Sequence, residues 1–159
     1  MRQRTDKGFS LIELLIVVAI IGIIAAIAIP NLLASRRAAN EGSAQQSLRT
    51  LSSAEATYQS TAGNGSYGSL ADLGSQRLVD SVLAVADVTA KSGYVFTVNP
   101  VAGPPAQFWA FCVPSITSGV GQTGTRRFAI QEDGVLRGDT TLSAPANAAA
   151  VTAMSPVGN

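Results

Sequence analysis

The start of the chain changes from an unbroken apolar run to a pattern with apolar and polar faces. Residues 9–29 are apolar or small throughout, except for Ser10 and a single carboxylate, Glu13. A helix of this length is roughly 31 Å long, which is the thickness of the hydrocarbon core of a bilayer. Gly22 and Pro30 punctuate the run, and Pro30 removes one backbone N–H from the helix. We therefore expect a membrane-spanning helix with a break or kink between these two residues.

After residue 30, apolar residues recur every three or four positions, which is the spacing of an amphipathic helix. The pattern predicts one helix from about Ser10 to Thr61, with its first half in the membrane and its second half packed on a globular head. Ala34, Arg37, Ala38 and Glu41 lead into the apolar stripe, which is expected to consist of Ala44, Leu48, Leu51, Ala54 and Tyr58.

The rest of the chain predicts a connecting loop and a small antiparallel sheet. Residues 62–92 are rich in turn formers, and Ser69 is placed to cap a short helical turn. Aromatic and β-branched runs follow, and Asp133-Gly134 is a hairpin signal between the last two of them. The strands are expected at residues 94–98, 107–113, 127–131 and 134–137. A four-stranded sheet with one face on the long helix gives an α+β fold with a single helical stem.

The charge of Glu13 needs compensation inside an apolar segment. An isolated acid costs roughly 2.5–3.5 kcal/mol in the middle of a membrane and less near an end. No Lys, Arg or His lies between Gly8 and Ser35 to pair with it. If the chain is cut after Gly8, however, the new amine of Phe9 is largely protonated at neutral pH. Glu13 is therefore expected to pair with a Phe9 amine, in the same chain or in another copy of it.

The same residues resemble the N-terminal signature of type IV prepilins. A short basic leader ends at Gly8 and is followed by Phe-Ser-Leu-Ile-Glu-Leu-Leu and a long apolar helix. The resemblance extends from Gly8 to about Arg37, and beyond that it is limited to the layout. It implies that a prepilin peptidase cleaves between Gly8 and Phe9 and N-methylates Phe9. It also implies that Glu13 meets the Phe9 amine of a neighbouring subunit during assembly.

This interpretation divides the chain into consecutive parts. They are a leader at residues 1–8, a hydrophobic helix at 9–30, its amphipathic continuation at 31–61, a connecting loop with short helical turns at 62–92, the sheet at 93–142 and an Ala- and Pro-containing tail at 143–159. The resemblance further implies that the helix between Gly22 and Pro30 loses order in an assembled filament. The tail has no clear period, so its order stays open.

Composition and charge exclude several classes of function. The formal net charge is +1, and removal of the leader leaves 8 basic against 9 acidic residues, so we expect no nucleic acid as the main partner. The chain has no His and a single Cys, Cys112, which excludes an intramolecular disulfide and leaves little material for a zinc site or a catalytic triad. We expect no catalytic residue, no metal and no cofactor. Cys112 is expected to pack as a small apolar group in a strand.

Three further motifs have simpler explanations than ligand binding. Residues 119–124 satisfy G-x-G-x-x-G, but a strand instead of a helix is expected after them, so the glycines are interpreted as a connection between strands. Asn64-Gly65-Ser66 fits a glycosylation acceptor and equally a turn. Glu132, Asp133 and Asp139 lack the spacing of a calcium loop. A calcium site near them stays open only because a secretion-system relative of the pilins holds one near its C-terminal end.

We expect a structural subunit that polymerises into a type IV pilus, and surface attachment or motility would fit such a filament. The basic leader predicts a cytoplasmic N-terminus, so the subunit would start as a single-pass protein of the inner membrane and end in an extracellular filament. The partners implied by the resemblance are copies of the same chain, the prepilin peptidase, the assembly machinery of the inner membrane, and membrane lipid before assembly.

Several alternatives stay open at this point. One is a pseudopilin of a type II secretion system, and another is a minor tip pilin that acts as an adhesin or binds DNA. An ordinary secretory signal cleaved near Ala26-Ile27-Ala28 would place an acid at the start of its apolar core and make that core unusually long. An anchor that is never cleaved would leave Glu13 unexplained. An enzyme is not expected, since no convergent nucleophile, base or metal set is visible.

Overall fold

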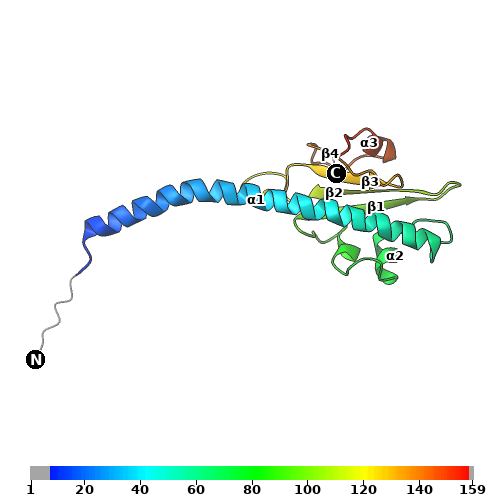
Figure 1. Ribbon diagram of the computed structural model, residues 1–159, viewed down its shortest axis with the longest axis horizontal. Coiled ribbons are helices and arrows are strands. Elements are labelled where there is room, and N and C mark those ends of the chain that lie inside the picture. The colour runs from blue at the N-terminus through cyan, green and yellow to red at the C-terminus, as the bar shows by residue number, and fades with distance from the viewer. Residues whose placement is uncertain (1–7, 158–159) are drawn as a thin grey trace, which may run out of the picture. The chain divides into compact units, whose positions relative to one another are not determined.

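The computed structural model describes residues 8–157, so residues 1–7 of the expected leader and residues 158–159 lie outside the described part. In chain order its elements are α1 (Leu11–Ser60), α2 (Leu70–Ser75), the short 3-10 helix η1 (Leu83–Val85), β1 (Tyr94–Val101), β2 (Gln107–Pro114), β3 (Arg127–Gln131), β4 (Arg137–Asp139) and α3 (Ala148–Thr152). Figure 1 labels the helices and strands. One long helix followed by a four-stranded antiparallel sheet confirms the expected α+β fold.

The chain forms two compact units that meet within α1, between Ser35 and Arg36. We call residues 8–35 the stem and residues 36–157 the head. α1 begins and ends one residue inside each of the bounds expected from the apolar pattern. Its buried residues are all in the head: Glu41, Ala44, Ser47, Leu48, Leu51, Ala54 and Glu55. The apolar stripe is therefore confirmed, but the burial of two carboxylates beside it is not something that the spacing predicts.

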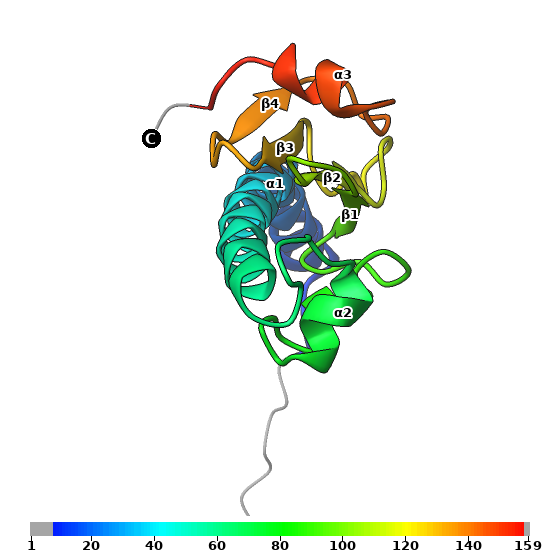
Figure 2. The same ribbon diagram turned by 90° about the vertical axis from the view of Figure 1, so that its right-hand side faces the viewer.

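The sheet of the head has the simplest possible order, β1-β2-β3-β4, with every neighbouring pair antiparallel. Figure 2 shows the head portion of α1 on one face of this sheet and α3 on the other. β1 and β4 are the edge strands. Because strand side chains alternate between the two faces, each face has its own set of apolar residues to cover.

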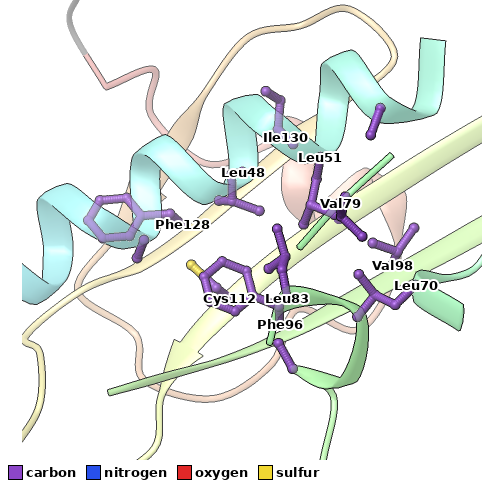
Figure 3. Packing of buried hydrophobic residues seen from close by; sticks show 14 of the residues in the cluster. Leu48, Leu51, Leu70, Val79, Leu83, Phe96, Val98, Cys112, Phe128 and Ile130 are labelled. Atoms are coloured by element: carbon purple, nitrogen blue, oxygen red, sulfur yellow. The ribbon is translucent and has the colours of Figure 1, made fainter. Parts of the chain in front are cut away.

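The main core lies between the sheet, α1 and the connecting loop. Leu48 and Leu51 of α1 meet Phe128 and Ile130 of β3 there, as Figure 3 shows. Each such buried side chain stabilises the head by about 1.5–3 kcal/mol. Cys112 of β2 is fully buried in the same cluster, which confirms its expected place as a small apolar group.

The tail covers the other face of the sheet. Asn147 caps α3 by accepting a hydrogen bond from the backbone N–H of Ala150. Val151 and Met154 then pack on apolar side chains of β2 and β3, in a second cluster with Phe111, Ala129, Trp109 and Val113. After α3 the tail runs beside β4, where the Val157 N–H donates to the carbonyl of Leu136 at 2.9 Å. The tail has no periodicity because its described residues cover the sheet as an irregular segment with one short helix, α3.

Ser69 caps α2 as expected. Its hydroxyl accepts from the backbone N–H of Asp72, and the Asp72 carboxylate accepts from the Ser69 N–H in return, which completes a capping box. The hydrogen bonds from Ser69 hold the pKa of Asp72 below its ordinary value.

Two strands differ from their expected bounds by more than one residue. β1 continues through Pro100 to Val101, where a stop was expected at Asn99-Pro100. Proline has no N–H to give to a neighbouring strand, but β1 is an edge strand, and edge strands tolerate this loss. The expected bound was therefore too short for a reason that depends on the position of the strand in the sheet.

β4 begins at Arg137 instead of Gly134, so the expected start of this strand is wrong, although β3 and β4 do pair as an antiparallel hairpin. A turn does form there, and the Gly134 N–H donates to the carbonyl of Gln131 at 3.0 Å. The Asp133 carboxylate then accepts from the Val135 N–H and from the Arg137 guanidinium. These bonds hold Val135 and Leu136 out of the ladder, and Leu136 enters the core instead.

Candidate functional site

Gly8 and Phe9 lie just before α1 and are open to solvent in the described chain. Phe9 exposes 81% of its surface. A Cβ added to Gly8 would meet no heavy atom within 4 Å, and the backbone of Gly8 does not require a left-handed conformation. The fold therefore gives no reason for glycine at this position. A requirement for glycine would have to come from something that acts on the chain from outside.

Glu13 lies in the first turn of α1. Its Oε2 atom accepts a hydrogen bond from the backbone N–H of Ser10 at 2.9 Å. The first N–H groups of a helix have no partner inside it, and the helix dipole favours negative charge there. The carboxylate is thus held at the helix end by one bond, on an exposed surface, with acceptor capacity left for a second donor.

This bond gives Glu13 an uncharged partner in its own chain, which the expected pairing with an amine did not include. Ser10 and Glu13 have the S-x-x-E spacing of a capping box, so the signal was present in the sequence. A backbone N–H carries no net charge, however. The bond therefore does not neutralise a carboxylate, and a cation remains a suitable further partner.

The stem offers a continuous apolar surface. Among the described residues, α1 is the helix that is long and apolar enough to cross a membrane, and the apolar segment that qualifies it buries none of its residues within the chain. Its large exposed side chains include Leu11, Ile12, Leu14, Leu15, Ile16, Val17, Val18, Ile20, Ile21, Ile23, Ile24, Ile27 and Ile29. Leaving each of them in water forgoes about 1.5–3 kcal/mol. These side chains therefore need lipid or another protein around them.

α1 runs through Gly22 and Pro30 without interruption, so the single chain has no helix break at either residue. A helix tolerates proline when the rest of its hydrogen bonds remain in place, although the local turn is weakened. The loss of helical order between these residues concerns an assembled filament, and it stays a prediction.

The head contains a second carboxylate with a very different environment. Glu41 is buried and accepts hydrogen bonds from the N–H and hydroxyl of Thr125, at 2.8 and 2.7 Å, and from the guanidinium of Arg126 at 3.0 Å. Burial raises the pKa of Glu41, but these bonds outweigh it and hold the pKa below its ordinary value. Glu41 fixes the β2–β3 connection to α1 and has no capacity left for a further partner.

Contacts in the same connection explain the last glycine of the G-x-G-x-x-G match. The Thr123 carbonyl accepts a hydrogen bond from the side chain of Asn40, so the segment is tied to α1. A Cβ on Gly124 would lie 1.9 Å from the hydroxyl oxygen of Tyr94, which donates to the Arg126 carbonyl. Gly124 is thus needed for close packing between strands, and no helix follows it.

The acidic residues near β4 are engaged with arginines. Asp133 pairs with Arg137, and Asp139 pairs with Arg127. Within residues 8–157 no three His, Cys, Asp or Glu side chains gather closely enough to hold a metal ion. Burial raises the pKa of the Cys112 thiol, so it is not a reactive thiolate.

The comparisons with known proteins bear on the stem. A family model described as the prokaryotic N-terminal methylation motif matches residues 3–29. The match is confined to this N-terminal segment, which is less than half of the chain. The matched segment contains Gly8, Phe9, Glu13 and the apolar half of α1.

Two curated type IV pilins each match a part of the chain. The type IV wide pilus major component PilA4 of Thermus thermophilus is 67% identical over 39 residues, which cover 24% of this chain and 30% of that protein. The type IV major pilin protein PilA of Myxococcus xanthus is 47% identical over 53 residues, which cover 33% of this chain and 24% of that protein. The matched segments thus span less than a third of either relative. No solved structure matches the chain.

Proposed function

We propose that this chain is the major structural subunit of a type IV pilus, and that it polymerises after cleavage between Gly8 and Phe9 and N-methylation of Phe9. The observation that carries the proposal is the stem, an apolar helix without burial of its own that bears a single charged side chain at its very start. Both matched relatives are described as major components of type IV pili, which supports the same role here.

The stem needs an apolar environment before and after assembly. Before assembly it would lie in the inner membrane, with the basic leader on the cytoplasmic side. In the filament, the exposed Leu, Ile and Val side chains would pack against the stems of other copies. Exchange of lipid contacts for protein contacts changes little apolar exposure, so the work of extraction has to come from an assembly machinery outside this chain.

Glu13 would set the position at which an arriving subunit joins the filament. The Ser10 N–H holds the carboxylate at the helix end with one oxygen engaged at 2.9 Å. The methylated amine of Phe9 from an arriving copy would then be attracted to this charge. In an apolar environment the attraction between opposite charges is far stronger than in water, so a subunit placed out of register would lose more than a hydrogen bond.

The proposal is tested by mass spectrometry of fibres sheared from cells. The expected result is that this chain is the main constituent, that its N-terminus is Phe9, and that its mass includes one methyl group. A chain that begins at Met1, or fibres without this chain, would overturn the proposal. Electron micrographs that show long surface fibres would distinguish a pilus from the short filament of a type II secretion system. No observation on this chain favours the secretion system.

A further inference from the structure

Glu55 is a buried carboxyl that its surroundings satisfy only in part. It lies in the last turns of α1 and exposes 0% of its surface. Its Oε2 atom accepts a hydrogen bond from the backbone N–H of Gly68 at 2.9 Å. Its Oε1 atom is buried and has no hydrogen-bond partner among the described residues. A carboxylate oxygen without a donor in such a place is costly, and the cost is much lower when the carboxyl is neutral.

No basic side chain within residues 8–157 forms an ion pair with Glu55. The ion pairs of the described residues join Lys91 to Asp80 and three arginines to other acids, and none includes Glu55. The charged group that acts on it is Asp72 of α2, which has the same sign. The ring of Tyr58 in α1 lies close to Gly68, whose N–H donates to Glu55. Burial, aided by Asp72 and opposed by the Gly68 N–H, raises the pKa of Glu55 to about 7.

The segment that bonds to Glu55 is tightly folded on the end of α1. The N–H of Gly63 donates to the carbonyl of Tyr58 at 2.8 Å. A Cβ on Gly63 or on Gly68 would lie about 3 Å from the ring of Tyr58, so both glycines allow the close approach. Next to Gly68, the Tyr67 ring packs on Phe108 of β2, with 4.7 Å between ring centroids. The hydrogen bond from Gly68 to Glu55 thus joins the loop to the end of α1, next to the contact between the loop and the sheet.

We propose that Glu55 is a proton-dependent latch for residues 61–69, which holds this loop closed when the carboxyl is protonated and loosens it when the proton leaves. Protonation removes the cost of a buried charge and the repulsion from Asp72, while Oε2 still accepts from Gly68. Deprotonation restores both costs, and opening of the loop lets water reach the carboxylate. Ser69 follows Gly68 and caps α2, so loosening would extend to that helix. The latch does not depend on whether the chain polymerises.

The direction of the pH effect follows from the raised pKa. The closed loop binds the proton more tightly than the open loop, whose carboxyl has the ordinary pKa of 4.5. Closure is therefore strongest below that value and weakens as the pH rises through about 7. By proton linkage, the opening constant is expected to rise on the order of 10- to 100-fold between pH 5.5 and pH 8.

The test is hydrogen exchange of the full chain in a non-ionic detergent, followed by mass spectrometry at pH 5.5 and pH 8 and corrected for the intrinsic exchange rates. Peptides that cover residues 61–69 report the loop, and peptides of β2 report the intact sheet. The wild-type loop should open at least 10-fold more often at pH 8, while β2 stays protected. Glu55→Gln should remove the difference between the two pH values. Glu132→Gln, which neutralises an exposed glutamate, should keep it.

Either of two results would overturn the latch. One is equal loop protection at both pH values in the wild-type chain, which needs no variant. The other is a pH difference in Glu55→Gln as large as in the wild-type chain, with β2 protected in both.

Discussion

α1 carries the same kinds of residues through the stem and the head, yet the two regions use them in opposite ways. The large apolar side chains of the stem from Phe9 to Ile29 expose 46–81% of their surface, whereas Leu48 and Leu51 in the head expose 0%. The carboxylates differ in the same sense. Glu41 of the head is buried and bound by three donors from two residues, and Glu13 of the stem is exposed and bound by one.

The difference shows that folding of the single chain buries and pairs the side chains of the head but not those of the stem. In the head, each apolar stripe finds a sheet, a loop or the tail to cover it. Among residues 8–157, nothing covers the apolar surface of the stem, and none of the ion pairs includes Glu13. A region of this kind is stable only in contact with lipid or with other molecules, and this is the behaviour expected of an assembly element.

The largest expected effect is on the leader. Gly8→Val should block processing almost completely, because a β-branched side chain would replace the glycine that the peptidase is proposed to recognise. The fold itself leaves room for the valine. The measurement is the intact mass of the chain extracted from membranes. Gly22→Val makes the same change inside the stem and should leave processing normal. A mature N-terminus at Phe9 in Gly8→Val would contradict the proposed cleavage.

The next prediction compares one substitution at two places on α1. Leu48→Ala should lower the free energy of unfolding of the head by about 2–5 kcal/mol, because it leaves a cavity in the main core. Leu15→Ala removes the same atoms from an exposed position of the stem and should change it by less than about 0.5 kcal/mol. Urea unfolding followed by near-ultraviolet circular dichroism measures both. Equal losses of unfolding free energy in the two variants would mean that Leu15 of the stem stabilises the head as much as Leu48 does, which would contradict the comparison.

A smaller loss is expected for Glu41→Gln. The amide can still accept from Thr125, but the charge that pairs with Arg126 is gone, so the cost should be roughly 1–2 kcal/mol of head stability. The same urea measurement applies. Glu132→Gln on the surface serves as the control and should be neutral. A neutral Glu41→Gln would show that the charge adds nothing to the attachment of the β2–β3 connection.

The smallest effect concerns acid. Because the pKa of Glu41 is lowered on folding, its contribution to stability is present above the ordinary value of 4.5 and is lost as the pH falls through the folded value. The head should therefore lose stability below pH 4.5, and Glu41→Gln should lose less. This slope is opposite in sign to that of Glu55, whose contribution is lost as the pH rises. Urea midpoints at a series of pH values separate the two, and an acid slope unchanged in Glu41→Gln would rule out this assignment.

Local patterns predict those parts of the fold that local contacts determine. The bounds of α1 follow from its periodicity and the glycine-rich turn after it, and the cap of α2 follows from Ser69. The bounds of β4 and the end of β1 were placed wrongly, because the bonds of Asp133 and the edge position of Pro100 appear only in the folded sheet. The tail was left open because its partner is a sheet face and not its own sequence.

The residues of the candidate site can likewise be divided into those that the sequence predicts and those that it does not. Gly8, Phe9 and Glu13 could be identified from the sequence. Glu13 is a charge in an apolar segment, and cleavage after Gly8 would give Phe9 the amine that can pair with it. The bond between Ser10 and Glu13 could have been predicted from their spacing. The burial of Glu41 and Glu55 could not, because the residues that surround Glu41 lie more than 80 positions away and Glu55 meets a backbone N–H that any residue could supply.

The central claim is that the negative charge of Glu13, and not only its hydrogen bond, is required for polymerisation. Glu13→Gln separates the two, because an amide oxygen can still accept from the Ser10 N–H but carries no charge. The measurement is the ratio of this chain in sheared fibres to that in membranes, in cells without a wild-type copy. We predict that the ratio falls at least tenfold while the amount in the membrane is unchanged. Fibres formed at the wild-type level by Glu13→Gln would contradict the claim.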